Sequence, residues 1–138
     1  MREIKFRGMD INGDWHYGLV GYKSTTLLPG GKTGWFISDI DGSPWAYQVR
    51  PETIGQCTGL KDKNSRLIYE GDIVELTDGC SFEKPIKTKV RWVEEDTCFA
   101  LLGSNNLYYK FWYFDSDSLE VIGDIHKNPE LLEDNNVH

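Results

Sequence analysis

The chain has 138 residues, enough for one domain or two very small ones, and its five Trp, seven Tyr and six Phe exclude a disordered polymer. The net charge of −7 lies entirely in the second half, because six basic and six acidic residues cancel in residues 1–60, whereas nine basic face sixteen acidic in residues 61–138. This excess disfavours general binding to nucleic-acid phosphates and suits a basic protein partner.

The cysteines and the N-terminus indicate a cellular compartment. Cys57, Cys80 and Cys98 are odd in number and have no metal-like spacing, so we expect no disulfide framework and a reducing environment. The first residues, MREIKFRGMD, lack the apolar stretch of a signal peptide, and no segment approaches membrane-spanning length. We therefore expect a cytoplasmic protein that does not enter a membrane.

The first half is predicted to form short antiparallel strands. Alternating or aromatic-rich segments predict four of them, at residues 2–7, 15–22, 34–40 and 45–49. Gly8 should end the first strand, and Asn12-Gly13 is a strong hairpin signal. Residues 1–60 are thus predicted to be a small antiparallel β-sheet region.

Residues 54–76 separate the halves with dense turn chemistry, namely three glycines and a polar run at residues 61–65. Five predicted strands follow, at residues 72–77, 87–93, 97–102, 107–114 and 119–125. Asn128, Pro129 and Glu130 then resemble the start of a short C-terminal helical turn. The fold class is therefore mainly β, with residues 61–138 forming an SH3-like five-stranded barrel or roll. The two halves are either separate domains or one packed unit.

No residue pattern points to catalysis. His16, His126 and His138 have no ligand partner at metal spacing, and nothing marks Cys57 as an activated nucleophile. Nucleotide-binding and hydrolase motifs are missing from the sequence, and the acidic residues 94–96 are typical of a solvated turn. We expect no catalytic, cofactor-binding or metal-binding residues, and hence a non-enzymatic protein.

The fourth strand of the second half, LYYKFWYF, is aromatic on both faces. If it stays extended, one face carries Leu107, Tyr109, Phe111 and Tyr113, and the other carries Tyr108, Lys110, Trp112 and Phe114. A strand of this kind needs cover on both sides, supplied by the first half, another protomer or a partner. Its second face is the candidate interaction surface: Tyr108, Lys110, Trp112 and Phe114.

A basic ridge on the second strand of this half offers an alternative. Lys87, Lys89 and Arg91 share one face, where they would grip a phosphate backbone or serve as a charged solvent face. Because the surrounding half is acidic, nucleic-acid binding is the less favoured interpretation.

The central segment TIGQCTGLKDKNSRLIYEGDIVEL resembles the signature of the YopX family of phage and prophage proteins, and MREIKFRGMD and LEVIGDIHKNPELLE resemble that family's two ends. The resemblance implies a small, mostly β protein of phage or prophage origin with an SH3-like C-terminal part. The family has no established activity, so it supplies no catalytic residues. One departure is Asn64-Ser65, where the family turn usually reads Asn-Gly.

Together these observations predict a non-enzymatic protein-interaction or self-associating module. The alternative is a nucleic-acid-binding accessory protein that uses Lys87, Lys89 and Arg91.

Overall fold

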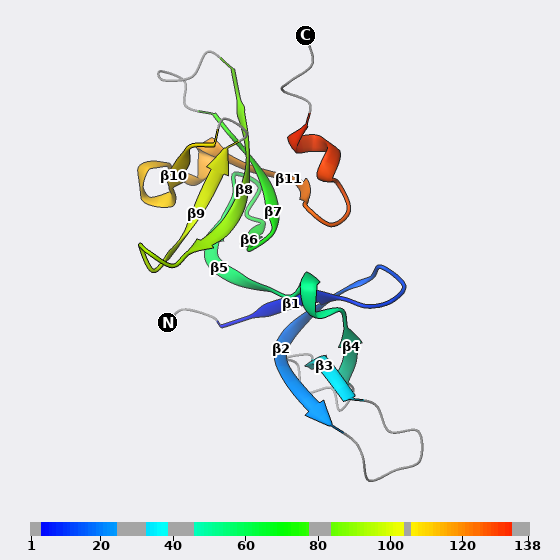
Figure 1. The fold of residues 1–138 in the computed structure, drawn as a ribbon. Coiled ribbons are helices and arrows are strands. Elements are labelled where there is room, and N and C mark those ends of the chain that lie inside the picture. Colours follow the sequence, from blue (N-terminus) through cyan, green and yellow to red (C-terminus); the bar gives the residue numbers. More distant parts are fainter. Residues whose placement is uncertain (1–3, 25–32, 39–45, 78–83, 104–105, 134–138) are drawn as a thin grey trace. The chain divides into compact units, whose positions relative to one another are not determined.

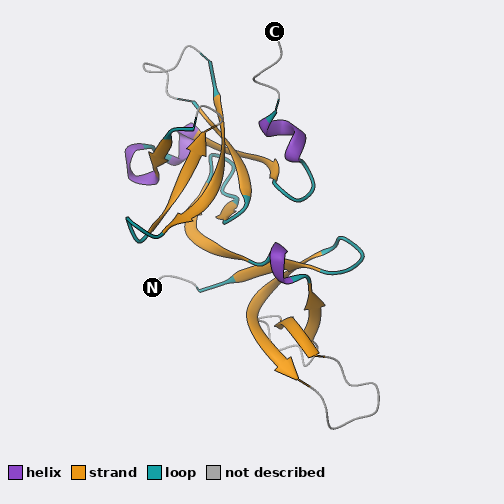
Figure 2. Cartoon of the chain, viewed as in Figure 1, coloured by secondary structure: helices purple, strands orange, loops and turns teal. Residues whose placement is uncertain are grey.

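The protein is mainly β, as predicted. The computed structural model describes residues 4–24, 33–38, 46–77, 84–103 and 106–133, and in these ranges its regular elements are strands and short 3-10 helices joined by turns and loops (Figures 1 and 2). The chain divides into two compact units, Met1–Cys57 and Thr58–His138.

The first unit is a curved antiparallel sheet with the strand order β4-β3-β2-β1-β5. Its elements are β1 (Phe6–Met9), β2 (Trp15–Ser24), β3 (Thr33–Ser38), β4 (Ala46–Val49), the 3-10 helix η1 (Pro51–Thr53) and the first residues of β5 (Gly55–Lys61).

Gly8 does not end the first strand, contrary to prediction, but lies within β1. A Cβ atom at residue 8 would sit 2.9 Å from the Cβ of Val49 and 3.0 Å from the Cδ1 of Ile37. The glycine therefore lets β1 approach the side chains of β3 and β4, which is the close-approach role of glycine within a strand.

The predicted Asn-Gly hairpin is confirmed. Asp10 Oδ1 accepts hydrogen bonds from the backbone N–H groups of Asn12 and Asp14 at 2.8 and 3.0 Å, and Gly13 takes a φ of 86°. Asp10 Oδ2 lies 2.7 Å from His16 Nε2. This hydrogen bond is the main reason why the pKa of Asp10 lies below its ordinary value.

The second unit contains a five-stranded antiparallel sheet with the order β10-β9-β8-β7-β11. Its strands are β7 (Asp72–Leu76), β8 (Ile86–Val93), β9 (Cys98–Gly103), β10 (Tyr108–Lys110) and β11 (Leu119–Asp124). Three 3-10 helices accompany them: η2 (Phe111–Tyr113), η3 (Ser116–Ser118) and η4 (Pro129–Leu132). The five predicted strands and the C-terminal turn are thus present, but β10 and β11 are the two edges of an open sheet, and a closed SH3-like barrel is not confirmed.

The predicted connector contains two strands that the sequence did not indicate. β5 continues through Lys61, and β6 (Leu67–Tyr69) pairs with it. The Thr58 hydroxyl donates to the Ile68 carbonyl at 2.8 Å, and Asp62 N donates to the Arg66 carbonyl at 2.9 Å. The polar run is therefore a hairpin turn.

The buried Asp62 side chain stabilises this turn through hydrogen bonds. Its Oδ1 accepts backbone N–H groups of Asn64 and Arg66, and its Oδ2 accepts that of Val121 on β11, each at 2.9 Å. Burial by itself raises the pKa of the Asp62 carboxyl, but the three backbone hydrogen bonds lower it by more, so the net pKa lies below the ordinary value.

The apolar core of this unit lies on one face of the five-stranded sheet. Its buried members are Ile68, Val74, Leu76, Val90, Leu101, Phe111, Leu119 and Val121. Ile86, Phe99, Tyr109 and Phe114 pack against them while keeping part of their surface exposed. These partly exposed aromatic rings mark the side on which the core opens to solvent.

Candidate protein-interaction groove

The aromatic segment is a strand for only three residues. β10 ends at Lys110, and the chain then turns through η2, which has about three residues per turn. Phe111 faces the core with 8% of its surface exposed, whereas Trp112 and Tyr113 are 73% and 67% exposed. The prediction of an extended strand over residues 107–114 is therefore wrong beyond Lys110.

This turn changes the sides on which the aromatic residues lie. Phe114, predicted to lie beside Trp112, packs on the core instead, with its ring centroid 6.3 Å from that of Tyr109. Tyr113, predicted to lie with the inward face, points outward and stacks on Trp112 with ring centroids 3.9 Å apart. The outward aromatic surface consists of a stacked pair rather than an alternating row.

A pocket of about 890 Å³ opens beside η2 within the second unit. Its lining comes from β5 between Thr58 and Lys61, from the start of β9, and from Lys110, Phe111, Trp112 and Phe114. We call it the aromatic groove, after its large apolar lining residues Leu60, Phe99, Phe111, Trp112 and Phe114. A site of this size and lining falls in the range of natural ligand pockets.

Charged side chains surround the aromatic groove. Lys61, Asp96 and Lys110 line it, and Lys110 Nζ lies 3.5 Å from Asp96 Oδ2. Two segments that contribute lining residues, the β8–β9 turn and residues 114–118, which include η3, are rich in exposed carboxylates. We call these the acidic rim: Glu94, Glu95, Asp96, Asp115 and Asp117.

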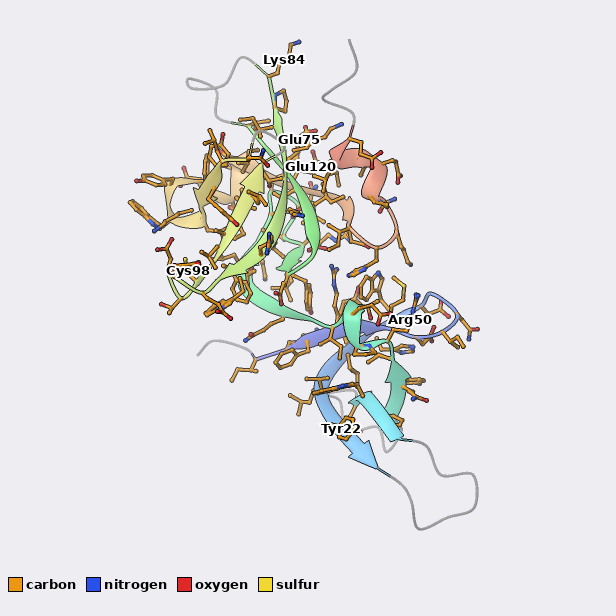
Figure 3. All side chains as sticks on the ribbon, in the orientation of Figure 1. Tyr22, Arg50, Glu75, Lys84, Cys98 and Glu120 are labelled. Atoms are coloured by element: carbon orange, nitrogen blue, oxygen red, sulfur yellow. The ribbon has the colours of Figure 1, made fainter. Side chains whose placement is uncertain are left out.

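Of the predicted surface residues, Lys110, Trp112 and Phe114 line the aromatic groove, whereas Tyr108 lies on β10, is half exposed and is not in the lining. The sequence analysis missed Leu60 and Phe99, which come from strands far from η2 in the chain. Cys98 also lines the groove at the start of β9 (Figure 3).

The basic ridge is interrupted by acidic and apolar neighbours. In the strand register Lys87 lies opposite Glu75 of β7, and Glu75 lies opposite Glu120 of β11. Figure 3 labels the two glutamates. Lys89 lines a small cavity of about 160 Å³ together with Leu132 of η4. Arg91 is exposed, whereas Lys87 and Lys89 are partly buried. Lys87, Lys89 and Arg91 are therefore unequally exposed along β8.

The histidine and cysteine side chains considered in the sequence analysis do not come together in one site. In the described parts of the chain, no three His, Cys, Asp or Glu side chains lie close enough together to hold a metal ion. His16 is held between the Asp10 carboxylate and the ring of Tyr47, stacked at 4.0 Å, and Cys57 is buried. His138 and Cys80 lie outside the described residues. Across the described ranges, no helix has the length and apolar character needed to span a membrane.

The fold and the sequence were compared with known proteins. The structure is similar to the crystal structure of protein EF1440 from Enterococcus faecalis, with a TM-score of 0.55 and 22% sequence identity, over 96% of this chain and 99% of that chain. At this identity the likeness concerns the fold alone. No curated protein matches the sequence. The family model described as YopX protein matches residues 6–133, nearly the whole chain, and the protein therefore belongs to the YopX family.

Proposed function

We propose that this protein is a non-enzymatic interaction module and that it binds an extended segment of a partner protein in the aromatic groove. The observation that carries the proposal is the stacked pair Trp112–Tyr113, highly exposed beside a pocket lined by core aromatics. Tryptophan and tyrosine are enriched in interface hot spots, and clustered exposed aromatic surface is typical of a binding site.

The charge around the aromatic groove indicates the chemistry of the partner. Of the acidic rim, Asp96 lines the groove and is paired with Lys110, while the other four carboxylates are exposed sequence neighbours of the lining residues Asp96, Phe114 and Ser116. A segment with an apolar anchor flanked by Lys or Arg residues fits this surface best, since opposite charges steer association.

The same charge argues against self-association through this surface. In a symmetric dimer the same patch meets itself, so one acidic rim would face another. Like charges opposed across an interface are unfavourable. We therefore favour a different, basic protein over a second copy of the chain.

The proposal includes a cellular setting and a finer fold assignment. The cysteine pattern supports action in the cytoplasm, and the family resemblance supports a phage or prophage origin. After η2 and η3, the chain returns as β11 and pairs with β7. This connection supports an SH3-like arrangement in which the sheet stays open.

The test is selection of binding peptides from a random surface-displayed library by the full chain, followed by affinity measurements. We expect enriched peptides to contain an apolar residue near Lys or Arg and to lose about tenfold or more in affinity toward Trp112→Ala. Tyr22→Ala is the matched control, because Tyr22 is an aromatic residue of the first unit with 60% exposure. Failure to enrich any peptide, or equal affinity for the wild type and Trp112→Ala, would overturn the proposal.

A further inference from the structure

The outer edge of β10 is a second binding element next to the aromatic groove. β10 is the last strand of the five-stranded sheet, and among the described strands it pairs with β9 alone. Lys110 belongs both to this edge and to the lining of the groove.

The hairpin that joins β9 and β10 decides which backbone groups point outward. Gly103 N donates to the Leu107 carbonyl at 2.8 Å, so residues 103 and 107 form a hydrogen-bonded pair. In an antiparallel ladder such pairs alternate with non-bonded ones, and the register pairs Tyr108 with Leu102 and Lys110 with Ala100. The N–H and C=O groups of Tyr108 and the N–H group of Lys110 therefore point away from β9, along the outer edge, whereas the C=O of Lys110, the N-cap residue of η2, accepts the first hydrogen bond of that helix.

We propose that the partner segment binds as an added β-strand on the outer edge of β10, with an apolar side chain in the aromatic groove and basic side chains toward the acidic rim. The inference rests on the proposed function and adds the binding mode to it. Main-chain hydrogen bonds from Tyr108 and Lys110 supply affinity, and the groove and the rim supply selectivity, as in other cases of strand addition.

The neighbouring structure limits the added strand to a short one. β10 spans three residues, and η2 then removes the backbone from the sheet edge. Short edge strands protect a protein from uncontrolled edge-to-edge pairing. Three residues of edge supply too few hydrogen bonds to hold a segment by themselves. A segment therefore binds well only when it also places an apolar side chain in the aromatic groove.

A backbone-specific substitution at Lys110 separates strand addition from side-chain binding. Lys110 has φ −88° and ψ 139°, close to the backbone of proline, and its N–H faces outward, so Lys110→Pro should leave the ladder with β9 intact. Lys110→Ala is the matched control, because it removes the same ion pair with Asp96 but keeps the N–H donor.

The probe is a fluorescein-labelled peptide that alternates arginine with valine and leucine, measured by fluorescence anisotropy against the full chain. Two relatives accompany it, one N-methylated on the backbone amides of one edge and one with glutamate in place of arginine. We expect Lys110→Pro to bind the parent peptide about tenfold more weakly than Lys110→Ala, and the wild type to bind both peptide relatives about tenfold more weakly than the parent.

The outcomes distinguish the two proposals. Equal binding by Lys110→Pro and Lys110→Ala, or full binding of the N-methylated peptide, overturns strand addition, whereas a loss in Trp112→Ala would still support the groove. No binding of the parent peptide, while library-selected peptides bind, also overturns strand addition. If Lys110→Pro shows a lower melting temperature than Lys110→Ala, the N-methylated peptide decides, since it needs no change in the protein.

Discussion

Asp62 and Val121 are 59 residues apart in the chain, yet the Asp62 carboxylate accepts the Val121 backbone N–H at 2.9 Å. The same carboxylate closes its own hairpin through Asn64 and Arg66. One buried side chain thus ties the turn between β5 and β6 to β11.

We expect Asp62→Asn to destabilise the second unit by about 2 kcal/mol, because the amide cannot accept three backbone N–H groups and brings its own donors toward one of them. Urea unfolding at about pH 7 measures the loss. Asp117→Asn, at an exposed position of η3, is the control and should change stability little. Equal unfolding midpoints for the two variants would contradict this role of Asp62.

The lowered pKa of Asp62 also predicts that the protein loses folding stability at acidic pH. A carboxyl whose pKa is lower in the folded than in the unfolded state contributes stability above the unfolded pKa, about 4, and that stability is lost as pH falls through the folded pKa. We expect the wild type to lose stability below about pH 4 more steeply than Asp62→Asn. Parallel slopes of unfolding free energy against pH would show that another group is responsible.

Ser65 occupies a backbone conformation that suits glycine. Its φ is 63°, in the left-handed region, where an L side chain costs about 1 kcal/mol. Ser65→Gly should therefore stabilise the protein by up to about 1 kcal/mol. Asn64→Gly, one position earlier and without a positive φ, should give no such gain. Thermal unfolding of the two variants compares them directly.

Gly123 leaves room for the turn that follows β11. A Cβ atom there would lie 2.6 Å from Asn128 Oδ1, the atom that accepts the Asp124 N–H at 3.2 Å. Gly123→Ala should cost about 1 to 3 kcal/mol, since Asn128 must move and give up this hydrogen bond. Gly21→Ala, in a strand where an added Cβ meets nothing within 4 Å, is the control for denaturant unfolding.

Two neighbours in η2 should behave in opposite ways. Phe111→Ala removes a core ring and should cost about 3 to 5 kcal/mol of stability. Trp112→Ala removes a ring that is 73% exposed and should change the unfolding free energy by less than about 1 kcal/mol. A large loss of stability in Trp112→Ala would mean that this residue supports the fold rather than a partner.

The sequence predicted elements well where one face of a strand is buried. In β8, buried Val90 precedes exposed Arg91, and the alternation of apolar and charged residues marks the strand directly. The same rule failed after Lys110, because consecutive aromatic residues all favour strands and no Gly or Pro marks the turn. Packing of Phe111 on the core determines η2, and packing of this kind is not visible in the sequence.

The aromatic groove was only partly predictable, for a related reason. Trp112 was predicted to belong to the candidate interaction surface, but Leu60 lies in a segment whose glycines and polar residues indicated a turn. β5 forms there because β6 pairs with it, which is a tertiary contact. The groove thus brings together residues of β5 and β9, which belong to two different sheets, and the sequence does not show that these strands lie close together.

The short helix η2 places a structural residue and two outward residues in immediate succession. Phe111 is fixed by the core, whereas Trp112 and Tyr113 are largely surrounded by solvent. Substitutions at positions 112 and 113 should therefore have little effect on folding stability. Selection at these two positions should depend on the molecule that binds there. Family members that recognise different targets should diverge at these two positions while keeping a large apolar residue at position 111.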